Sequence, residues 1–528
     1  MNHLIINRDY PPCSYQPGGI GTYVDHVSRL LAANGETVHI IGQLWPGAPR
    51  PREISMQGRL IVHRVPLDDP LPQAPATDAA LLRAFRNSVL PVQAFAWQAA
   101  RLAESLVDTE AIDVIEGQDY EAPLYYLLLR RALGLATVRP VPVFVHLHTG
   151  TEFVYTHNEW DRTQPDYVAA KRLEDYAIRA ADAVLCPSRF LARIAEGHYQ
   201  IDRGSTVVIP YPIGESSVLR RDTVTWTDGT ICYVGRLEPR KGVREWIDAA
   251  VAVANDDPSP RFTLIGGDTP YGGPGGRSTR ELLQSRIPAA PRTRFEFFDF
   301  APRGELAAHL QRARMAVVPS RWENFPNTCI EAMSSGLPVI ASPTGGMAEM
   351  IEDGRTGWMA GGSDPASLAA ALRRALTTPP QLVAEMGAAA ARSIRMLCDN
   401  NDTIRRQIEF RRRVVTRGCV RSTREPALLD DGISHRETMA TLLRGAPFRP
   451  NVLVPQVPAA SGHTLTPREI LRATPQLRRE LVRRVLADPI YVLRWIAWHI
   501  RRAVSHVPRR LFGRGIRLSK DRLTKRGT

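Results

Sequence analysis

The stretch TICYVGRLEPRKG, residues 230–242, places an apolar run directly before a loop that holds glycines and cations. The run TICYV is rich in β-branched and aromatic residues, which predicts a buried strand, and a helical pattern follows the loop. Arg236 and Lys241 offer a planar fork and a point charge to a diphosphate, and the glycines allow the backbone to come close to it. A βα turn with surface cations is the alternative for this loop taken alone.

Strand-like apolar runs alternate with helical patterns on both sides of this stretch. A polar, turn-rich break at residues 212–228 separates two series of such runs. The first series lies at residues 4–6, 38–41, 112–115, 143–147 and 183–185, and the second at 230–234, 262–265, 316–318 and 338–340. This alternation predicts an α/β fold with two Rossmann-like domains, whose parallel sheets bind ligands at the carboxyl ends of their strands. We expect a central cleft between them.

The composition is that of an ordinary globular protein, with 44% hydrophobic and 23% charged residues in a chain of 528. The six cysteines show no C-x-x-C spacing, which argues against a zinc site or a disulfide framework and favours a reducing, cytoplasmic setting. No run of about 18 apolar residues occurs, so no membrane-spanning helix is expected.

A second motif, PSRWENFPNTCIEAM at residues 319–333, follows another predicted strand. It carries Glu323 in a loop and Glu331, eight residues later, about one turn into the following helix. Backbone N–H groups at the start of that helix, near Asn327 and Thr328, form an anion-binding site. Two ordinary surface acids are the alternative for the glutamate pair taken alone.

The order and spacing of these two motifs resemble those of the retaining glycosyltransferases of family four, which have the GT-B fold. The family signature E-x7-E matches Glu323 and Glu331, and the GRL…KG element precedes it at a typical distance. The resemblance covers about residues 1–410 and is strongest over 230–360. Further matches lie at residues 336–341, Gly345, Gly346 and Glu349.

The resemblance implies a division of roles. Arg236 and Lys241 would bind the donor diphosphate and stabilise it as a leaving group, Glu331 would hold the ribose, and Glu323 would contact the transferred sugar. It also implies donor contacts for Asn324, Phe325 and Pro326, a phosphate contact for Asn327 and Thr328, and a base contact near Phe300. This chain has Asn-Phe-Pro-Asn at 324–327, where many members carry a glycine.

Two elements of the first domain complete the expected site. Gly18 and Gly19 precede the first helix, where glycines permit a phosphate or sugar to approach a helix N-terminus. In HLHTGTE, residues 146–152, His148 is nearest the carboxyl end of its strand, and the resemblance implies contact with the transferred sugar. A hydrogen-bonded structural histidine is the alternative. Glu116 and Asp119 are candidates to line the acceptor side.

The expected reaction is transfer of a hexosyl unit from a nucleoside-diphosphate sugar to a hydroxyl acceptor with retention, in polysaccharide, glycolipid or glycoconjugate synthesis. The sugar nucleotide is a co-substrate, and no cofactor is expected. The sequence has no Asp-x-Asp pair, which agrees with cations and a helix N-terminus, in place of a metal ion, neutralising the diphosphate. The alternatives are a GT-B epimerase or hydrolase and a catalytically silent scaffold.

Four segments are expected along the chain: an acceptor-side domain at 1–215, a nucleotide-sugar-binding domain at 216–395, a helix returning toward the first domain at 396–415, and an extension at 416–528. The extension is Pro-rich, then helical and basic, and residues 481–528 carry 13 Lys and Arg against two acids, or +11 of the net +14. Its helical pattern at 490–504 is typical of docking on anionic lipid at the inner face of a membrane, which would suit a lipid-linked acceptor. A helix packed on the catalytic domains is the alternative, and no motif favours nucleic acid.

Overall fold

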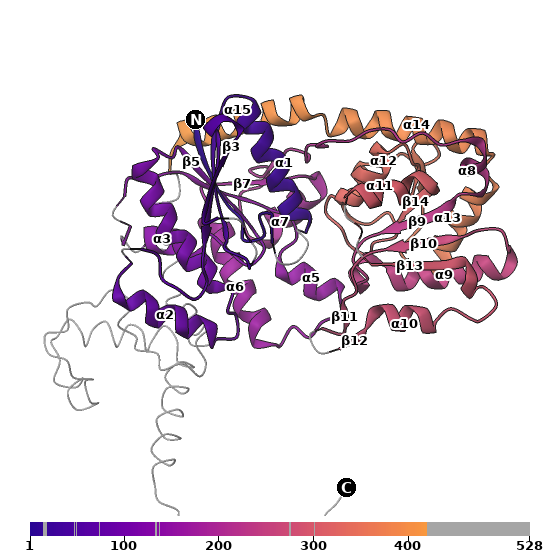
Figure 1. Cartoon of the computed structure of the whole chain (residues 1–528), viewed down its shortest axis with the longest axis horizontal. Coiled ribbons are helices and arrows are strands. Elements are labelled where there is room, and N and C mark those ends of the chain that lie inside the picture. The colour runs from indigo at the N-terminus through magenta and orange to yellow at the C-terminus, as the bar shows by residue number, and fades with distance from the viewer. Residues whose placement is uncertain are drawn as a thin grey trace, which may run out of the picture. The chain divides into compact units, whose positions relative to one another are not determined.

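The computed structural model describes residues 1–419 apart from 14–17, 47, 49, 73, 133–134, 137, 274–275, 300 and 302. The chain divides into two compact units, Met1–Val452 and Leu453–Thr528, and every described residue belongs to the first (Figure 1). The expectations for Phe300, for the extension beyond residue 419 and for its membrane-docking helix therefore lie outside the described residues. Within the described part of the chain, no helix is long and apolar enough to span a bilayer.

The first lobe is built on an eight-stranded sheet in the order β3-β4-β2-β1-β5-β6-β7-β8, in which only the β3–β4 pair is antiparallel. Its strands are β1 Asn2–Ile6, β2 Thr37–Gln43, β3 Arg52–Ser55, β4 Leu60–Val65, β5 Val114–Gln118, β6 Val143–His146, β7 Ala183–Cys186 and β8 Val207–Val208. Its helices are α1 Gly19–Ala33, α2 Ala76–Arg86, α3 Gln93–Thr109, α4 Tyr125–Ala132, α5 Thr151–His157, α6 Pro165–Ala180 and α7 Arg189–His198. Successive residues of β1 are fully buried, as expected for a parallel strand with both faces covered.

The second lobe has a six-stranded parallel sheet in the order β13-β10-β9-β14-β15-β16. Its strands are β9 Thr230–Val234, β10 Phe262–Ile265, β13 Phe295–Phe298, β14 Ala313–Val318, β15 Val339–Ala341 and β16 Gly357–Met359, with a small hairpin of β11 Pro270–Tyr271 and β12 Arg277–Ser278. Its helices are α8 Thr223–Asp228, α9 Val243–Asp256, α10 Thr279–Ser285, α11 Arg303–Arg312, α12 Asn327–Ser334, α13 Pro365–Thr377 and α14 Pro380–Leu397.

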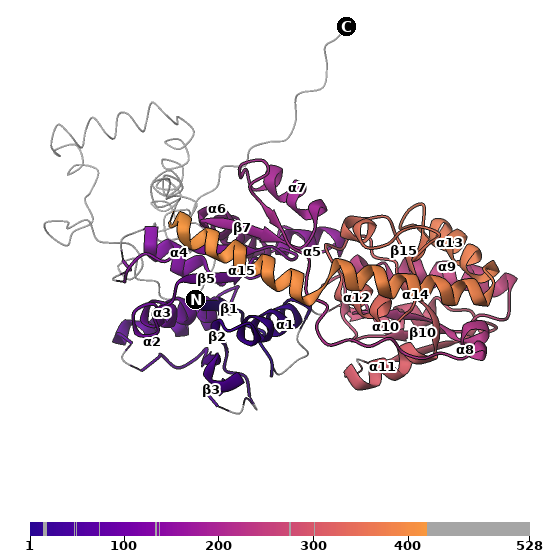
Figure 2. The same ribbon diagram turned by 90° about the horizontal axis from the view of Figure 1, so that it is seen from above.

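Helix α15, Asn400–Arg417, follows α14 and returns to the first lobe, where it contacts α1 and β5 (Figure 2). Phe410 packs edge-on against Phe144 of β6, with 5.0 Å between the ring centroids. Arg411 donates from Nη2 to Glu116 of β5 at 2.6 Å, and neither side chain is exposed to solvent. The last described helix therefore completes the core of the first lobe.

The expectation of two Rossmann-like sheets is confirmed, and the strand that carries Glu116 shows where the sequence interpretation was wrong. The expected strand at 112–115 is β5 at Val114–Gln118, so Glu116 lies inside the strand and not at its end. An unpaired buried carboxylate is costly, so Glu116 needs a counter-charge inside the lobe. Its counter-charge, Arg411, is 295 residues away in the sequence.

Candidate active site

The loop between β9 and α9 is fixed in place by a glycine. Gly242 has a φ of +66°, and a Cβ atom there would lie 2.0 Å from the carbonyl oxygen of Pro319. Only glycine combines that backbone conformation with that close approach. Lys241 is therefore held directly beside the loop that follows β14 and carries Glu323.

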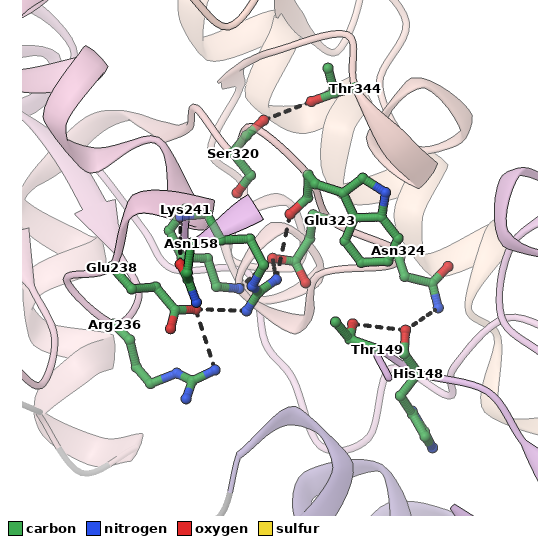
Figure 3. Close-up of polar contacts among 12 residues, drawn as sticks. His148, Thr149, Asn158, Arg236, Glu238, Lys241, Ser320, Glu323, Asn324 and Thr344 are labelled. Atoms are coloured by element: carbon green, nitrogen blue, oxygen red, sulfur yellow. Dashed lines mark hydrogen bonds and ion pairs between the residues drawn. The ribbon is translucent and has the colours of Figure 1, made fainter. Parts of the chain in front are cut away.

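Five charged side chains from these two loops form one ion cluster (Figure 3). Oε2 of Glu323 accepts from Nη1 of Arg240 at 3.0 Å and from the ammonium of Lys241. Oε1 of Glu238 accepts from Nη2 of Arg240 at 2.7 Å and lies 3.3 Å from Nη2 of Arg236. Three cations thus face two carboxylates, which leaves the cluster one positive charge in excess.

The charged side chains of this ion cluster differ in exposure, which distinguishes the buried members from those that a ligand can reach. The side chains of Glu238 and Arg240 are 1% and 4% exposed, whereas that of Arg236 is 61% exposed. Burial alone would raise the pKa of Glu323, but Lys241 and Arg240 outweigh it and hold that pKa below its ordinary value. Burial would likewise raise the pKa of Glu238, but Arg236, Arg240 and Lys241 outweigh it and lower that pKa to about 2. Both carboxylates are therefore ionised at neutral pH, and Arg236 is the exposed cation of the cluster.

Two glycines shape the loop that carries Glu323. A Cβ atom at Gly345, whose φ is +78°, would lie 1.8 Å from the carbonyl oxygen of Glu323, and one at Gly346 would lie 1.7 Å from that of Asn324. The backbone N–H of Gly346 donates to the carbonyl of Glu323 at 3.0 Å. The loop that carries Glu323 therefore packs against two positions that only glycine can occupy.

The Gly345→Ala variant is expected to bind a nucleotide sugar at least roughly tenfold more weakly, because strain of this kind costs about 1–3 kcal/mol and displaces Glu323. Calorimetric titration of the folded variant measures the effect. Gly354→Ala is the matched control, since Gly354 has a similar φ of +74° but nothing within 4 Å of its Cβ position. Equal affinities in the two variants would contradict this account of the loop.

Asn324 and Asn327 connect the second lobe to the first. Nδ2 of Asn324 donates to the carbonyl of His148 at 3.0 Å, and its Oδ1 accepts from the hydroxyl of Ser188 at 2.5 Å. Nδ2 of Asn327 donates to the carbonyl of Gly19 at 3.1 Å. These amides therefore join the lobes at the predicted site, a role that the sequence did not suggest for them.

The N-termini of α1 and α12 meet at this junction. Neither Gly18, which precedes α1, nor Pro326, which precedes α12, caps its helix with a side-chain hydrogen bond. Gly18 and Gly19 are exposed, and Asn327 and Thr328 form the half-buried first turn of α12. Two positive helix ends therefore lie together just after the loop that carries Glu323, an arrangement that favours an anion.

His148 lies on the first-lobe side in a wholly buried polar group. Its Nε2 donates to the amide oxygen of Gln118, so its Nδ1 is the acceptor for the hydroxyl of Tyr211. Burial and the adjacent His146 lower the pKa of His148 well below its ordinary value, so the ring is neutral. Both ring nitrogens already have hydrogen-bond partners. His148 can therefore bind a ligand only by giving up its bond to Tyr211 or Gln118, or it can act indirectly by orienting Gln118.

Glu331 is half-buried and lines a pocket at the lobe junction. Side chains of α1, α11 and the 212–219 linker complete the wall of this pocket. Phe325 is not at that wall: it is 4% exposed and packs edge-on against Tyr211 with 5.6 Å between the ring centroids. Glu116 and Asp119 are likewise buried, so neither presents an exposed carboxylate to an acceptor.

Several residues of the site escaped the sequence interpretation. Arg240 and Glu238 lie in the cationic loop, but nothing in the sequence indicates that Arg240 is buried while Arg236, in the same loop, is exposed. Asn158 accepts from the backbone N–H of Arg240 at 2.8 Å across the lobe junction. Gln118 and Tyr211 hold His148. Gln118 follows the predicted strand at 112–115 by three residues, whereas no predicted strand directly precedes Tyr211.

Comparison with known proteins agrees with this geometry. The family model described as glycosyl transferases group 1 matches residues 221–393, and the model described as glycosyltransferase family 4 matches residues 17–215. A D-inositol 3-phosphate glycosyltransferase of Geodermatophilus obscurus is 28% identical over 383 residues, which are 69% of this chain and 79% of that protein.

Solved structures show the same fold at low sequence identity. Sucrose-phosphate synthase of Thermosynechococcus elongatus superposes with a TM-score of 0.60 at 19% identity, covering 79% of this chain and all of that one. The Anabaena protein HepE, solved in complex with UDP and glucose, gives a TM-score of 0.55 at 17% identity, covering 77% of this chain and 98% of that one. The two sheets of this chain are thus those of the GT-B fold, and the chain belongs to the family-four, group 1 glycosyltransferases, enzymes that use nucleotide-sugar donors.

Proposed function

We propose that this glycosyltransferase moves a hexosyl unit from a nucleoside-diphosphate sugar to a hydroxyl with retention of configuration and without an essential metal ion. The observation that carries the proposal is that Arg236 and Lys241 belong to one ion cluster with Glu323, whose loop leads into the uncapped N-terminus of α12, and that this N-terminus contacts the uncapped N-terminus of α1. Such an arrangement concentrates positive charge where a diphosphate leaving group develops negative charge.

In the proposed mechanism the donor diphosphate lies against Arg236, Lys241 and the first turn of α12. The ammonium of Lys241 has three N–H donors and gives one to Glu323, so it has capacity for a phosphate oxygen as well. Glu331, which lines the pocket at the lobe junction, is assigned to the ribose hydroxyls. Glu323 is assigned to the transferred sugar, at the price of sharing its carboxylate with two cations.

The glycosidic bond would break through a transition state with oxocarbenium character, as in glycosidases. We assign no enzyme nucleophile: the acceptor hydroxyl attacks from the face that the diphosphate leaves, and the leaving phosphate takes its proton. Closure of the lobes by Asn324 and Asn327 would exclude water from the donor. The proposed role of His148 is to fix Gln118 on the side from which the acceptor enters.

The test is a screen of UDP-, GDP- and ADP-sugars against the purified full-length protein, with product analysis in the presence and absence of acceptor alcohols. We expect one nucleotide to bind and an α-linked donor to give an α-linked product by proton NMR. Activity is expected to persist in excess EDTA. If the donor is consumed at the same rate with and without an acceptor, the enzyme is a hydrolase or an epimerase. If no nucleotide sugar binds, the protein is a catalytically silent scaffold. HepE, with its bound UDP, makes UDP-sugars the first to try.

The proposal includes a cytoplasmic location and a contact of residues 481–528 with the inner face of a membrane. Its support is the charge of that segment, 13 Lys and Arg against two acids. A role in polysaccharide, glycolipid or glycoconjugate synthesis, which we also propose, is compatible with this location.

A further inference from the structure

Trp322, the residue directly before Glu323, belongs to the second lobe but packs among aromatic rings of the first lobe. Its indole lies nearly parallel to the rings of Phe153 and His157, at interplanar angles of 7° and 17° and centroid distances of 4.8 and 5.4 Å. The ring of Phe190, near the start of α7, lies 6.3 Å away at an angle of 57°. Only 5% of Trp322 is exposed. An aromatic contact therefore joins the two lobes at the position next to Glu323.

The first-lobe side of this contact comes mainly from one helix. Phe153 and His157 are four residues apart on α5 and therefore lie on the same face of it. The beginning of α5 is fixed inside the first lobe, where the backbone N–H of Thr151 donates to a carboxylate oxygen of the buried Glu174 at 2.8 Å. His148 precedes Thr151 by three residues. One short helix thus leads from the loop of His148 to the aromatic contact.

His157 takes part in this contact as an uncharged ring. Burial and the positive charges of Arg240 and Arg321 lower its pKa to about 4, so the imidazole is neutral at neutral pH. Arg321 also pairs with Glu159, but these side chains are 27% and 46% exposed, and an ion pair open to water contributes little. The aromatic rings are therefore the main contact between α5 and the loop that carries Glu323.

The backbone of this loop connects the aromatic contact with the carboxylate of Glu323. The N–H of Arg321 donates to the carbonyl of Arg240 at 2.9 Å, and the carbonyl of Trp322 accepts from Nη1 of Arg240 at 3.4 Å. The same Nη1 and the ammonium of Lys241 both donate to Oε2 of Glu323. No residue in the described part of the chain donates to Oε1. The loop therefore fixes one carboxylate oxygen and leaves the other for a hydroxyl.

We propose, on the basis of the proposed function, that Trp322 is a positioning residue for glycosyl transfer, because its packing on the rings of α5 sets where Oε1 of Glu323 meets the transferred sugar. Trp322 and Glu323 are neighbours in the chain, so a shift of the indole away from these rings displaces the carboxylate. The rate of transfer is sensitive to such a displacement, since the groups around the reacting sugar must be held in place. The nucleotide is assigned to other side chains, so its binding should depend little on this contact.

The test uses the full-length protein with the UDP-, GDP- or ADP-sugar that is active in the screen. Phe153→Leu in the first lobe and Trp322→Leu in the second each remove a ring and keep an apolar side chain. Each is expected to lower kcat by roughly 10–100-fold, a loss that a misplacement of about 1 Å can cause. The Kd of the free nucleoside diphosphate, measured by calorimetry, should change less than about twofold. Trp322→Phe keeps a ring and is expected to restore most of the lost kcat.

A double variant shows whether the two rings act through each other. If they do, Phe153→Leu combined with Trp322→Leu lowers kcat hardly more than either change alone. Trp97→Leu is the matched control, because Trp97 is also 5% exposed and packs against Tyr126 inside the first lobe, with 5.5 Å between the ring centroids. Its loss should lower the thermal midpoint by a comparable amount and leave kcat near the wild-type value.

The outcomes separate the two proposals. Failure of every nucleotide sugar to react with an acceptor counts against the proposed function and removes the basis of this one. Wild-type kcat in Phe153→Leu and Trp322→Leu, additive losses in the double variant, or an equal loss of kcat in Trp97→Leu overturns the role of Trp322 and leaves the donor site intact. If Trp322→Leu unfolds, as judged by circular dichroism, Phe153→Leu carries the decision, since Phe153 is only half-buried.

Discussion

Lys241→Ala is expected to lower kcat/KM for the nucleotide sugar by roughly 10²–10³-fold or more, the loss typical of removing one fixed donor from a developing negative charge. The effect should appear mainly in kcat, since the charge on the leaving diphosphate grows in the transition state. The fold should survive, because Glu323 keeps its bond to Arg240 at 3.0 Å. Steady-state kinetics with the donor found in the screen measures the loss, and Arg236→Ala is expected to behave alike.

Lys171→Ala is the control for this prediction. Lys171 lies on α6 of the first lobe and pairs with Glu152 at 3.1 Å and Asp175 at 2.6 Å, so it too is a lysine between carboxylates. Its loss is expected to leave kcat/KM near the wild-type value. Wild-type activity in both Lys241→Ala and Arg236→Ala would refute the assignment of these side chains to the leaving group.

Arg411→Met is expected to destabilise the first lobe by about 3–5 kcal/mol, because it leaves the buried Glu116 carboxylate without its arginine counter-charge. That figure corresponds to a fall of roughly 6–20 °C in the thermal midpoint of a lobe of this size. Arg405→Met on the same helix is the control: Arg405 is 60% exposed and its ion pairs should contribute nothing measurable. Scanning calorimetry of the full-length variants compares the two midpoints.

Adding Glu116→Gln to Arg411→Met should restore much of the lost stability, since an uncharged pair no longer needs a counter-charge. The amide oxygen can still accept from Tyr23, whose hydroxyl lies 3.2 Å from Oε1 of Glu116. A double variant as unstable as Arg411→Met would show that packing of Arg411 on the Phe144 ring, at 4.9 Å, matters more than its charge.

The pair also predicts a pH dependence. Burial would raise the pKa of Glu116, but Arg411 and His146 outweigh it and bring that pKa below its ordinary value. The stability contributed by the pair is therefore present above the ordinary pKa of a glutamate and is lost as the pH falls toward the lowered one. Wild type should lose stability over this acid range, and the double variant should lose less of it.

The fold was largely readable from the sequence because its strands are apolar runs that alternate with helical patterns. Runs such as those of β1 and β9 are short, apolar and rich in β-branched or aromatic residues, as expected of parallel strands that are buried on both faces. The predicted series lack β3, Arg52–Ser55, which is a polar edge strand, and β4, Leu60–Val65, in which the polar His63 and Arg64 follow the apolar run. They also lack β13 and the short strands β8 and β16. The strand predicted at 112–115 is β5 at Val114–Gln118.

The sequence predicts those parts of the candidate site that depend on the type of a residue and its immediate neighbours, and not those that depend on contacts between distant residues. The charges of Arg236 and Lys241 and the adjacent glycines favour a diphosphate site but leave a βα turn with surface cations open, and the order and spacing of the two motifs are needed to choose between them. The burial of Arg240 depends on Glu323, which follows it by 83 positions, and the bridging role of Asn324 depends on Ser188 and His148 of the other lobe. Contacts of this kind are set by how the two sheets meet, and no local pattern encodes them.

The return of α15 to the first lobe sets an order of events during synthesis. At roughly 5–20 residues per second, the 295 residues between Glu116 and Arg411 take roughly 15–60 s to translate. Throughout that interval the nascent first lobe must either leave the Glu116 carboxylate protonated or keep β5 open to water. The first lobe therefore finishes folding only after the second lobe has been synthesised, and a nascent chain stalled before residue 400 would expose the first lobe to chaperones and proteases.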